Sequence, residues 1–183
     1  TIEPRKNLVR LMEALAQLRR TNGAGHVLIV VGNRGWKDQA VFATVNRLEL
    51  EDAVRFLGYL PEADLVGLYN LAEAVAFPSL YEGFGLPVLE AMACGTAVIA
   101  SPNGSLQEVA GDAAQFIDPS DVDSIAEGLR RVLLDEDWRK ELERRGRARA
   151  AQFTWLDAAA QTRELYSLAA STRGSPDKGF AGD

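Results

Sequence analysis

Two carboxylates stand beside a glycine-containing stretch that would leave the backbone open to a ligand. Glu82 and Glu90 lie eight positions apart within PSLYEGFGLPVLEAMACGTAVIAS, residues 78–101. Gly83 and Gly85 let the backbone adopt conformations closed to other residues and let a ligand come close to it. The segment therefore combines two acceptors for hydroxyl groups with a backbone that a bound molecule can approach.

The residues after the two glycines predict the start of a helix and a place for an anion. Pro87 suits the first helical position, because its missing N–H would have no partner there anyway. The amides of Phe84 to Leu86 would then face an anion, assisted by the helix dipole. Glu82 precedes this turn and Glu90 follows about one turn into the helix, so we predict that both flank one anion-binding corner. Charge-assisted hydrogen bonds contribute roughly 1.5–3 kcal/mol each, enough to orient a ligand that carries hydroxyls and a phosphate.

Other kinds of chemistry find little support in the sequence. The chain has one histidine and one cysteine, and no cluster with metal-ligand spacing, which argues against zinc chemistry and hydrolytic triads. His26 begins an apolar run and is interpreted as a strand-edge residue, and Cys94 lies in an apolar helical segment as a packing residue. Asp121 and Asp123 mimic a metal-binding DxD motif, but they follow Ser120 at a helix start, where acids cap and complement the dipole. We interpret them as structural.

Composition and charge exclude several classes of partner. The chain has 183 residues, of which 47% are hydrophobic and 25% charged, with a net charge of −6. This balance gives no electrostatic reason to expect nucleic acid or an anionic membrane surface. No apolar run is long enough to span a bilayer and no signal peptide opens the chain, and a single cysteine fits a reducing compartment. We therefore expect a cytoplasmic protein.

The hydrophobic pattern alternates between helices and short buried strands. Strands are predicted at 27–31, 53–58, 74–79, 96–101 and 114–118. Helices are predicted at 5–20, 41–48, 62–72, 86–94, just after 105, 121–134, 137–152 and 154–170. Ser105 with Glu108, and Thr154 with Asp157, are predicted as helix caps. This alternation predicts an α/β fold, a Rossmann-like parallel sheet with helices on both faces.

The pattern also predicts the extent of the domain. One domain is expected over 1–170, followed by a flexible, Gly/Ser/Pro-rich tail at 171–183. The opening TIEPRKNL reads as a strand-to-helix turn, so we expect that a first strand is truncated. Trp36 is expected to line a ligand cleft, whereas Trp138 and Trp155 are expected to pack among the C-terminal helices.

Three loops should carry useful chemistry at the carboxyl ends of the strands, where ligands collect in parallel α/β sheets. The first, TIEPRKN at 1–7, places Arg5 and Lys6 at a helix start. The second is GNRGWK at 32–37, and the third is EGFGLP at 82–87. A GxGxxG fingerprint is missing, which counts against a dehydrogenase.

At these residues the sequence resembles the GT-B-fold glycosyltransferases, specifically the retaining family 4 type. The resemblance is carried by Glu82-x7-Glu90 in its segment, by EPRKN at 3–7, and by two longer blocks. These are RFLGYLPEADLVGLYNLAEAVAFPS at 55–79 and GSLQEVAGDAAQFIDPSD at 104–121. The resemblance runs from Thr1 to about Ala170 and implies the C-terminal, donor-binding lobe of such an enzyme.

The resemblance implies a role for each matching residue. Lys6 would pair with the diphosphate of a nucleotide sugar, Glu90 would accept the ribose hydroxyls, and Glu82 would hold hydroxyls of the donor hexose. The remaining donor-binding positions that it implies are the backbone around Gly83, Phe84, Gly85 and Leu86, and that of Leu60 near the base. Glu82 and Lys6 are therefore the candidate catalytic residues. The family often has an arginine where this chain has Thr1, and Arg5 is a candidate to replace it.

Each of these roles has an alternative in which the side chain is solvated and binds no ligand. Taken without the resemblance, Glu82 and Glu90 could equally be solvated carboxylates, since acids near a helix N-terminus are stabilised in any case. The alternative for Lys6 is a surface lysine in a first helical turn.

The resemblance implies a hexosyltransferase of polysaccharide biosynthesis that uses a GDP- or UDP-linked sugar, with no metal and no other cofactor. Within this resemblance, the opening segment TIEPRKN favours mannose as the hexose. The acceptor, a glycan or a lipid-linked glycan, and any membrane association would come through an absent N-terminal lobe. The alternatives are a nucleotide-sugar-binding module that is inactive without that lobe, and a GT-B-fold epimerase.

Overall fold

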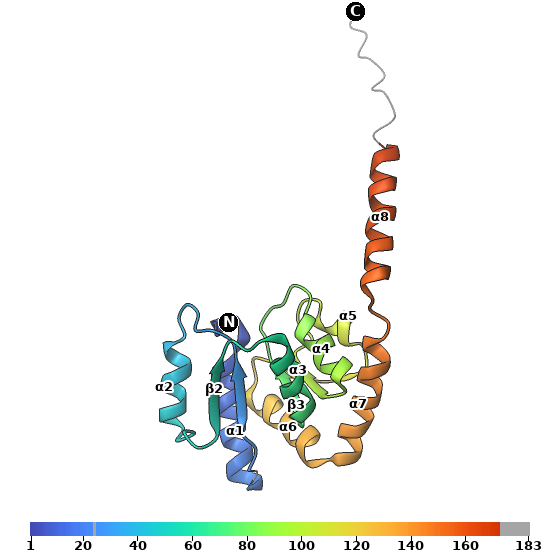
Figure 1. The fold of residues 1–183 in the computed structure, drawn as a ribbon. Coiled ribbons are helices and arrows are strands. Elements are labelled where there is room, and N and C mark those ends of the chain that lie inside the picture. The colour runs from blue at the N-terminus through green and yellow to red at the C-terminus, as the bar shows by residue number, and fades with distance from the viewer. Residues whose placement is uncertain (24, 173–183) are drawn as a thin grey trace, which may run out of the picture. The chain divides into compact units, whose positions relative to one another are not determined.

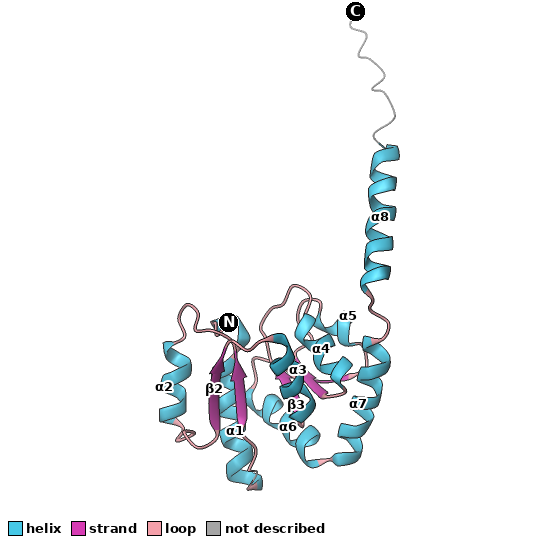
Figure 2. Ribbon diagram, viewed as in Figure 1, coloured by secondary structure: helices cyan, strands magenta, loops and turns pink. Residues whose placement is uncertain are grey.

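The computed structural model describes residues 1–23 and 25–172 (Figures 1 and 2). The described chain forms two compact units, one spanning Thr1–Ala150 and one beginning at Ala151. The first unit holds every strand in the described part of the chain, alternating with helices as the hydrophobic pattern predicted. Among the described residues, no helix is both long and apolar enough to cross a bilayer.

Each predicted strand and helix is present, with boundaries that shift by a few residues. The strands are β1 (Leu28–Val31), β2 (Val54–Gly58), β3 (Ala74–Phe77), β4 (Ala97–Ala100) and β5 (Ala114–Phe116). The helices of the first unit are the 3-10 helix η1 (Pro4–Lys6), α1 (Leu8–Asn22), α2 (Gln39–Arg47), α3 (Glu62–Leu71), α4 (Leu86–Cys94), α5 (Leu106–Ala110), α6 (Val122–Leu134) and α7 (Glu136–Ala150). The second unit holds α8 (Trp155–Thr172).

The strands form two parallel sheets rather than the single sheet that the pattern predicted. β1 pairs with β2, and β4 lies between β3 and β5, always in parallel. No strand among the described residues lies between β1 and β3, so the two sheets are not hydrogen-bonded to each other. They are joined by the packing of side chains on α1 instead, and Figure 1 shows α1 beside β2.

Helix α1 belongs to two hydrophobic clusters, one against each sheet. Leu11 and Leu18 pack in the cluster that includes β4, α6 and α7, whereas Met12 and Leu15 pack in the cluster that includes β1, β2 and α2. All four side chains are almost fully buried. Burying an aliphatic side chain of this size contributes about 1.5–3 kcal/mol, so α1 contributes to the stability of both sheets.

Strand β4 shows why the larger sheet needs helices on both faces. Ile99 packs in the cluster with α1 and α6, and its neighbour Val98 packs in the cluster with α3, α4 and α5. Successive strand side chains point to opposite faces of a sheet, and here both faces are buried. The predicted Rossmann-like architecture is confirmed for this sheet.

Two of the predicted details of helix starts and packing are wrong. Ser105 is the N-cap of α5, but its side chain makes no capping bond and its hydroxyl is buried without a partner in the described chain. Its backbone is helical, with φ −80° and ψ −6°, whereas an N-cap side chain reaches its target from the extended conformation. Trp155 at the start of α8 is exposed rather than packed.

Other details of the helices are confirmed. The Thr154 hydroxyl accepts from the Asp157 N–H at 3.0 Å, which is the predicted cap of α8. Trp138 is partly buried against the cluster of α6 and α7. The predicted flexible tail, 171–183, lies outside the described residues from residue 173 onward.

Candidate functional site

The carboxyl ends of three strands meet at one edge of the larger sheet. Phe77 at the end of β3 is in register with Ala100 at the end of β4, which is in register with Phe116 at the end of β5. The loops that follow these strands therefore leave the sheet side by side. The predicted loop 82–87 is one of them.

The N-terminal segment connects this edge to the edge of the smaller sheet. The Ile2 N–H donates to the Asn33 carbonyl after β1 at 2.8 Å, and the Leu80 N–H after β3 donates to the Arg5 carbonyl at 2.8 Å. Two of the three predicted loops, 1–7 and 82–87, are thus brought together directly. The third, 32–37, contacts the same segment from the other side.

The loop after β1 has a packing role that its sequence did not reveal. A Cβ on Gly35 would lie 2.3 Å from the Ile2 carbonyl oxygen, so only glycine lets the N-terminal segment pass this close. Trp36 next to it is 62% exposed, with the Lys37 ammonium 5.0 Å from its ring. Its predicted position along a ligand cleft stays a prediction.

Asn7 fixes the N-terminal segment at the site, and sequence reasoning missed it. It is buried in the left-handed conformation with φ 59°, between η1 and α1. Its side-chain amide donates to the Pro78 carbonyl at 3.0 Å and to the Pro119 carbonyl at 2.7 Å. One amide therefore ties the turn that carries Arg5 and Lys6 to the loops after β3 and β5. The available signal was an asparagine between two helical segments, since asparagine tolerates this conformation.

Three of the predicted site residues are in direct contact. Glu82 Oε1 lies 2.7 Å from Lys6 Nζ, and Glu82 Oε2 lies 2.7 Å from Arg5 Nη1. Burial of Glu82, which is 7% exposed, by itself raises its pKa. Hydrogen bonds from Lys6, Ser79 and Arg5 outweigh that effect, so the pKa of Glu82 lies below its ordinary value of 4.5. Glu82 is a carboxylate at neutral pH, held between two cations.

The two cations differ in their surroundings. Lys6 Nζ lies 4.8 Å from the centre of the Phe77 ring, so its ammonium is held by a π face as well as by Glu82. Arg5 is more exposed and also contacts Glu3 at 2.7 Å. The hydrogen bond to Glu82 raises the pKa of Arg5. Arg5 therefore supplies a second positive charge beside Lys6, which is the property required if it replaces the arginine expected at Thr1.

Helix α4 begins immediately after this cluster. Gly85 is its N-cap with φ +91°, and a Cβ there would lie 2.4 Å from a methyl carbon of Leu106. Pro87 is the second residue of the helix, not the first as predicted, but its missing N–H still falls in the turn whose amides have no partner within the helix. Phe84 and Leu86 are about half exposed at this corner.

Glu90 faces a different neighbour from Glu82. It is the fifth residue of α4, is exposed, and accepts a hydrogen bond from the Tyr69 hydroxyl of α3 at 3.0 Å. The structure therefore places one carboxylate before the helix against η1 and the other on the helix against α3. Leu60 follows β2, at the edge of the smaller sheet.

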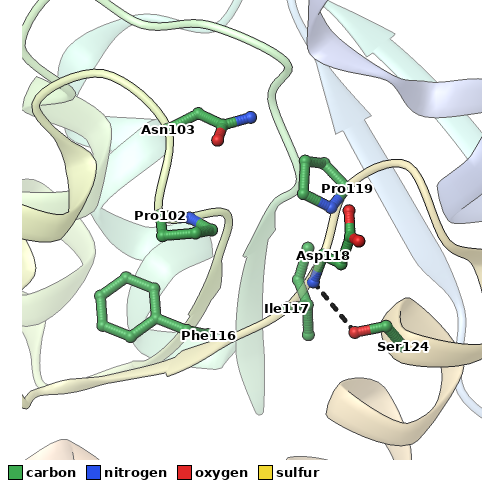
Figure 3. A pocket seen from close by; sticks show the side chains of 7 residues that line it. All are labelled: Pro102, Asn103, Phe116, Ile117, Asp118, Pro119 and Ser124. Atoms are coloured by element: carbon green, nitrogen blue, oxygen red, sulfur yellow. Dashed lines mark hydrogen bonds between the residues drawn. The ribbon is translucent and has the colours of Figure 1, made fainter.

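A pocket of about 460 Å³ opens beside this corner (Figure 3). It is lined by residues after β4, by the last residue of β5 and the residues that follow it, and by one residue of α6: Pro102, Asn103, Phe116, Ile117, Asp118, Pro119 and Ser124. The Asp118 carboxylate accepts hydrogen bonds from the N–H and the hydroxyl of Ser120. The backbone N–H of Asp118 donates to the Ser124 hydroxyl at 2.9 Å. The pocket contains neither glutamate of the candidate site, and most of its wall is apolar.

The residues considered for other chemistry have structural partners. Asp121 accepts from the Asp123 N–H at 3.0 Å as the cap of α6, which confirms its structural interpretation. His26 Nε2 lies 3.4 Å from Glu73, just before β1. Over residues 1–23 and 25–172, no group of three or more His, Cys, Asp or Glu side chains is arranged to hold a metal ion.

Comparison with known sequences identifies the family. The sequence profile of the family described as "Glycosyl transferases group 1" matches residues 1–149. The chain belongs to this family. The match covers all but the last residue of the first compact unit, and it includes Lys6, Glu82 and Glu90.

Individual members of the glycosyl transferases group 1 family and solved structures agree with this assignment. The chain is 44% identical over 168 residues to O-antigen chain mannosyltransferase B of Escherichia coli, covering 92% of this chain and 44% of that protein. Sucrose-phosphate synthase from Thermosynechococcus elongatus superposes with a TM-score of 0.83 at 32% identity, over 93% of this chain and 44% of that one. Anabaena HepE in complex with UDP and glucose gives a TM-score of 0.81 at 27% identity, over 90% and 46% of the two chains.

These matches define which part of a glycosyltransferase the chain represents. It spans a little under half the length of these three proteins. Its fold is that of the C-terminal lobe of the GT-B glycosyltransferases, as the sequence predicted. The recognition of a glycosyltransferase from the Glu82-x7-Glu90 segment and its flanking blocks is confirmed.

Proposed function

We propose that this glycosyltransferase domain binds a nucleoside diphosphate hexose and supplies the groups that transfer the hexose, with retention of configuration, to an acceptor hydroxyl. The supporting observation is the contact of Glu82 with Lys6 and Arg5 directly before the start of α4. This cluster lies at the carboxyl edge of a parallel sheet, where open α/β folds bind ligands. The similarity to HepE, whose structure holds UDP and glucose, supports the same class of donor.

The role of the site in this reaction is electrostatic. As the bond between the hexose and the diphosphate breaks, its electron pair goes to the diphosphate, and negative charge grows on that leaving group. The acceptor oxygen forms the new bond to the same carbon of the hexose, and its proton goes to the released diphosphate. Lys6, which contacts Glu82 just before α4, and the amides of the first turn of that helix would stabilise this charge. Glu82 would accept hydrogen bonds from the hexose hydroxyls, and Glu90 would accept those of the ribose. The reaction as proposed needs no metal ion.

Glu82 has a second task in this account, because it already holds both cations in the chain without a donor. A lysine ammonium on a four-carbon stem is flexible, and ordering it costs conformational entropy. The bond to Glu82 and the contact with the Phe77 ring keep the Lys6 ammonium at the corner before the diphosphate arrives. The arrangement is thus preorganised, which reduces the entropic cost of binding.

Mannose is the hexose that we propose, with GDP as the nucleotide. The relative that covers 92% of this chain is named a mannosyltransferase of the O-antigen chain. A second relative, from Mycolicibacterium hassiacum, is named an α-(1→4)-mannosyltransferase and is 35% identical over 170 residues. These names support a role in polysaccharide biosynthesis, with a glycan or lipid-linked glycan as acceptor.

A second candidate function is donor binding without turnover by this chain alone. The observation that favours it is the extent of the match, since the chain spans 44% of the mannosyltransferase of Escherichia coli. Turnover assays with GDP-mannose, with and without an added N-terminal lobe, separate the two. Transfer by the 183-residue chain alone would support the first function, and transfer only with the added lobe would support the second.

Isothermal titration of the chain with GDP-mannose, UDP-glucose and ADP-glucose tests the proposed site. We expect GDP-mannose to bind, and Lys6→Ala and Glu90→Ala each to weaken it about tenfold or more, because each removes a charge-assisted hydrogen bond. Lys140→Ala is the matched control, since Lys140 is 65% exposed on α7 and paired with Glu136. If the wild type and both site variants bind all three nucleotide sugars equally weakly, the proposal is contradicted.

A further inference from the structure

The hydrogen bond between Tyr69 and Glu90 joins a buried side chain to an exposed one. The Tyr69 hydroxyl donates to Glu90 Oε2 at 3.0 Å. Tyr69 is 9% exposed, whereas Glu90 is exposed on the surface of α4. In the described part of the chain, this is the hydrogen bond that orients the Glu90 side chain, since no ion pair with it is found.

Tyr69 is a rigid donor because both its ring and its backbone are fixed. The ring packs among Val88 and Met92 of α4 in the cluster on one face of the larger sheet. The Tyr69 carbonyl accepts from the buried Thr96 hydroxyl at 2.7 Å. The hydroxyl is therefore presented at a constant place beside Glu90, at the point where α3 meets α4.

The bond has a direction that matters for Glu90. Burial and the nearby negative charge of Glu90 raise the pKa of Tyr69, so its phenol keeps its proton and donates throughout the neutral range. The bond occupies Oε2 and leaves Oε1 for another donor. An exposed glutamate otherwise loses side-chain entropy when a ligand orders it. Because the bond to Tyr69 already orders the Glu90 side chain, part of this entropy is lost before a ligand binds.

We propose that Tyr69 is a positioning residue for ribose recognition: it holds Glu90 so that Oε1 accepts a ribose hydroxyl of the donor nucleotide. The inference rests on the proposed function, in which Glu90 binds the ribose. It assigns to α3, an element outside the Glu82-x7-Glu90 segment, a part in donor affinity and in the discrimination of ribose from deoxyribose.

Titration of the 183-residue chain with GDP and UDP, and with their 2′-deoxy and 3′-deoxy forms, tests this inference. The variants are Tyr69→Phe, which keeps the buried ring and removes the hydroxyl, Glu90→Ala, and the double variant. Tyr166→Phe, 74% exposed on α8, is the matched control. We expect Tyr69→Phe to weaken the ribonucleotide about three- to tenfold, the effect of one hydrogen bond. Tyr69→Phe should also reduce the preference for the ribonucleotide over its deoxy form. In the Glu90→Ala background, it should not weaken binding any further.

The outcomes distinguish this inference from the proposed function. Unchanged binding by Tyr69→Phe, while Glu90→Ala weakens it, would overturn the role of Tyr69 and leave the proposed function in place. An equal loss from Tyr69→Phe with and without Glu90, or a loss with an unchanged ribose preference, would make the tyrosine merely structural and also overturn it. If Glu90→Ala binds both nucleotides like the wild type, the ribose site itself is wrong, and the inference falls with it.

Discussion

At the scale of single residues, Glu82 has the most constrained position in the site. It is buried and has two cationic partners, one at each carboxylate oxygen. Removing one partner of a buried ion pair leaves a charge that is neither paired nor hydrated, which typically costs about 3–5 kcal/mol. Substitutions of Lys6 therefore act on stability as well as on binding, although Arg5 continues to pair with Glu82 in such variants.

The lowered pKa of Glu82 makes its contribution to stability depend on pH. A carboxylate whose pKa is depressed in the folded chain adds stability above its unfolded pKa, and loses it as pH falls through the folded value. We expect Glu82→Gln to lower the free energy of unfolding at pH 7 and to differ less from wild type as pH falls below about 4.5, the ordinary value for this group. Urea denaturation at several pH values between 7 and 3 measures this difference.

A control separates this effect from the general loss of a carboxylate. Glu164→Gln removes an exposed glutamate of α8, outside the first compact unit, and should change the free energy of unfolding little at any pH. A difference between wild type and Glu82→Gln that grows toward acid pH would contradict the assignment of Glu82 as a carboxylate stabilised by Lys6 and Arg5.

The sequence predicted which residues belong to the site but not how they pair. Glu82, Lys6 and Arg5 were each assigned from motifs, yet Lys6 and Glu82 are 76 positions apart and their contact depends on where η1 meets the loop after β3. Asn7, which fixes that meeting through two carbonyls, carries no motif of its own. Long-range hydrogen bonds of this kind have no local signature in a sequence.

At the scale of elements, the site depends on two loops that touch through their backbones. Gly104, in the loop after β4, has φ +63°, and a Cβ there would lie 2.3 Å from the Glu82 carbonyl oxygen. The Asn103 amide in the same loop donates to the Leu80 carbonyl at 3.0 Å. The loop after β4 therefore supports the backbone that carries Glu82.

This contact predicts a specific effect of an added methyl group. Gly104→Ala should cost about 1–2 kcal/mol for the left-handed conformation, and roughly 1–3 kcal/mol more because the methyl meets the Glu82 backbone. By moving Glu82 it should also weaken GDP-mannose binding. Gly23→Ala is the matched control, because Gly23 has φ +62° and an added Cβ there would have no neighbouring atom within 4 Å.

The two variants are compared by urea denaturation and by titration. The conformational cost is common to both, so the difference between them isolates the contact with Glu82. Gly23→Ala should lose stability but keep donor affinity. Equal losses of stability together with wild-type donor binding in both variants would show that the loop after β4 does not support the site.

At the level of single elements, the hydrophobic pattern placed every strand and helix, whereas the capping signals were right at Thr154 and Asp121 and wrong at Ser105. Each strand and helix was found near its predicted place, because alternation of buried strands and amphipathic helices follows directly from burial. The helix predicted at 5–20 is interrupted at Asn7, where the buried amide bonds outweigh helix continuity. The Ser105 cap failed because the backbone there is already helical.

At the scale of the whole first unit, one helix and one short segment connect two sheets. Helix α1 is shared by two hydrophobic clusters, and residues 1–6 are hydrogen-bonded to the loops after β1 and β3. The candidate site lies on this connection, at the edge of the larger sheet. The position of the cations relative to Glu82 therefore depends on the packing of the whole unit.

The sequence predicted the fold class and the family but not the division into two sheets. Buried parallel strands read as continuous apolar runs whichever neighbours they pair with, so the pattern of β1 and β3 did not reveal that they are not paired with each other. The motif blocks around Glu82 and Glu90 identified the family because their residues and spacing are specific.

The central claim is that the corner formed by Lys6, Glu82 and the start of α4 binds the diphosphate of the donor. A crystal structure of the chain with GDP tests it most directly. We predict diphosphate oxygens about 2.7–3.0 Å from Lys6 Nζ, beside the first turn of α4, with the ribose next to Glu90. GDP bound elsewhere, for example in the pocket lined by Phe116 and Asp118, with Lys6 bonded to Glu82 alone, would contradict the claim.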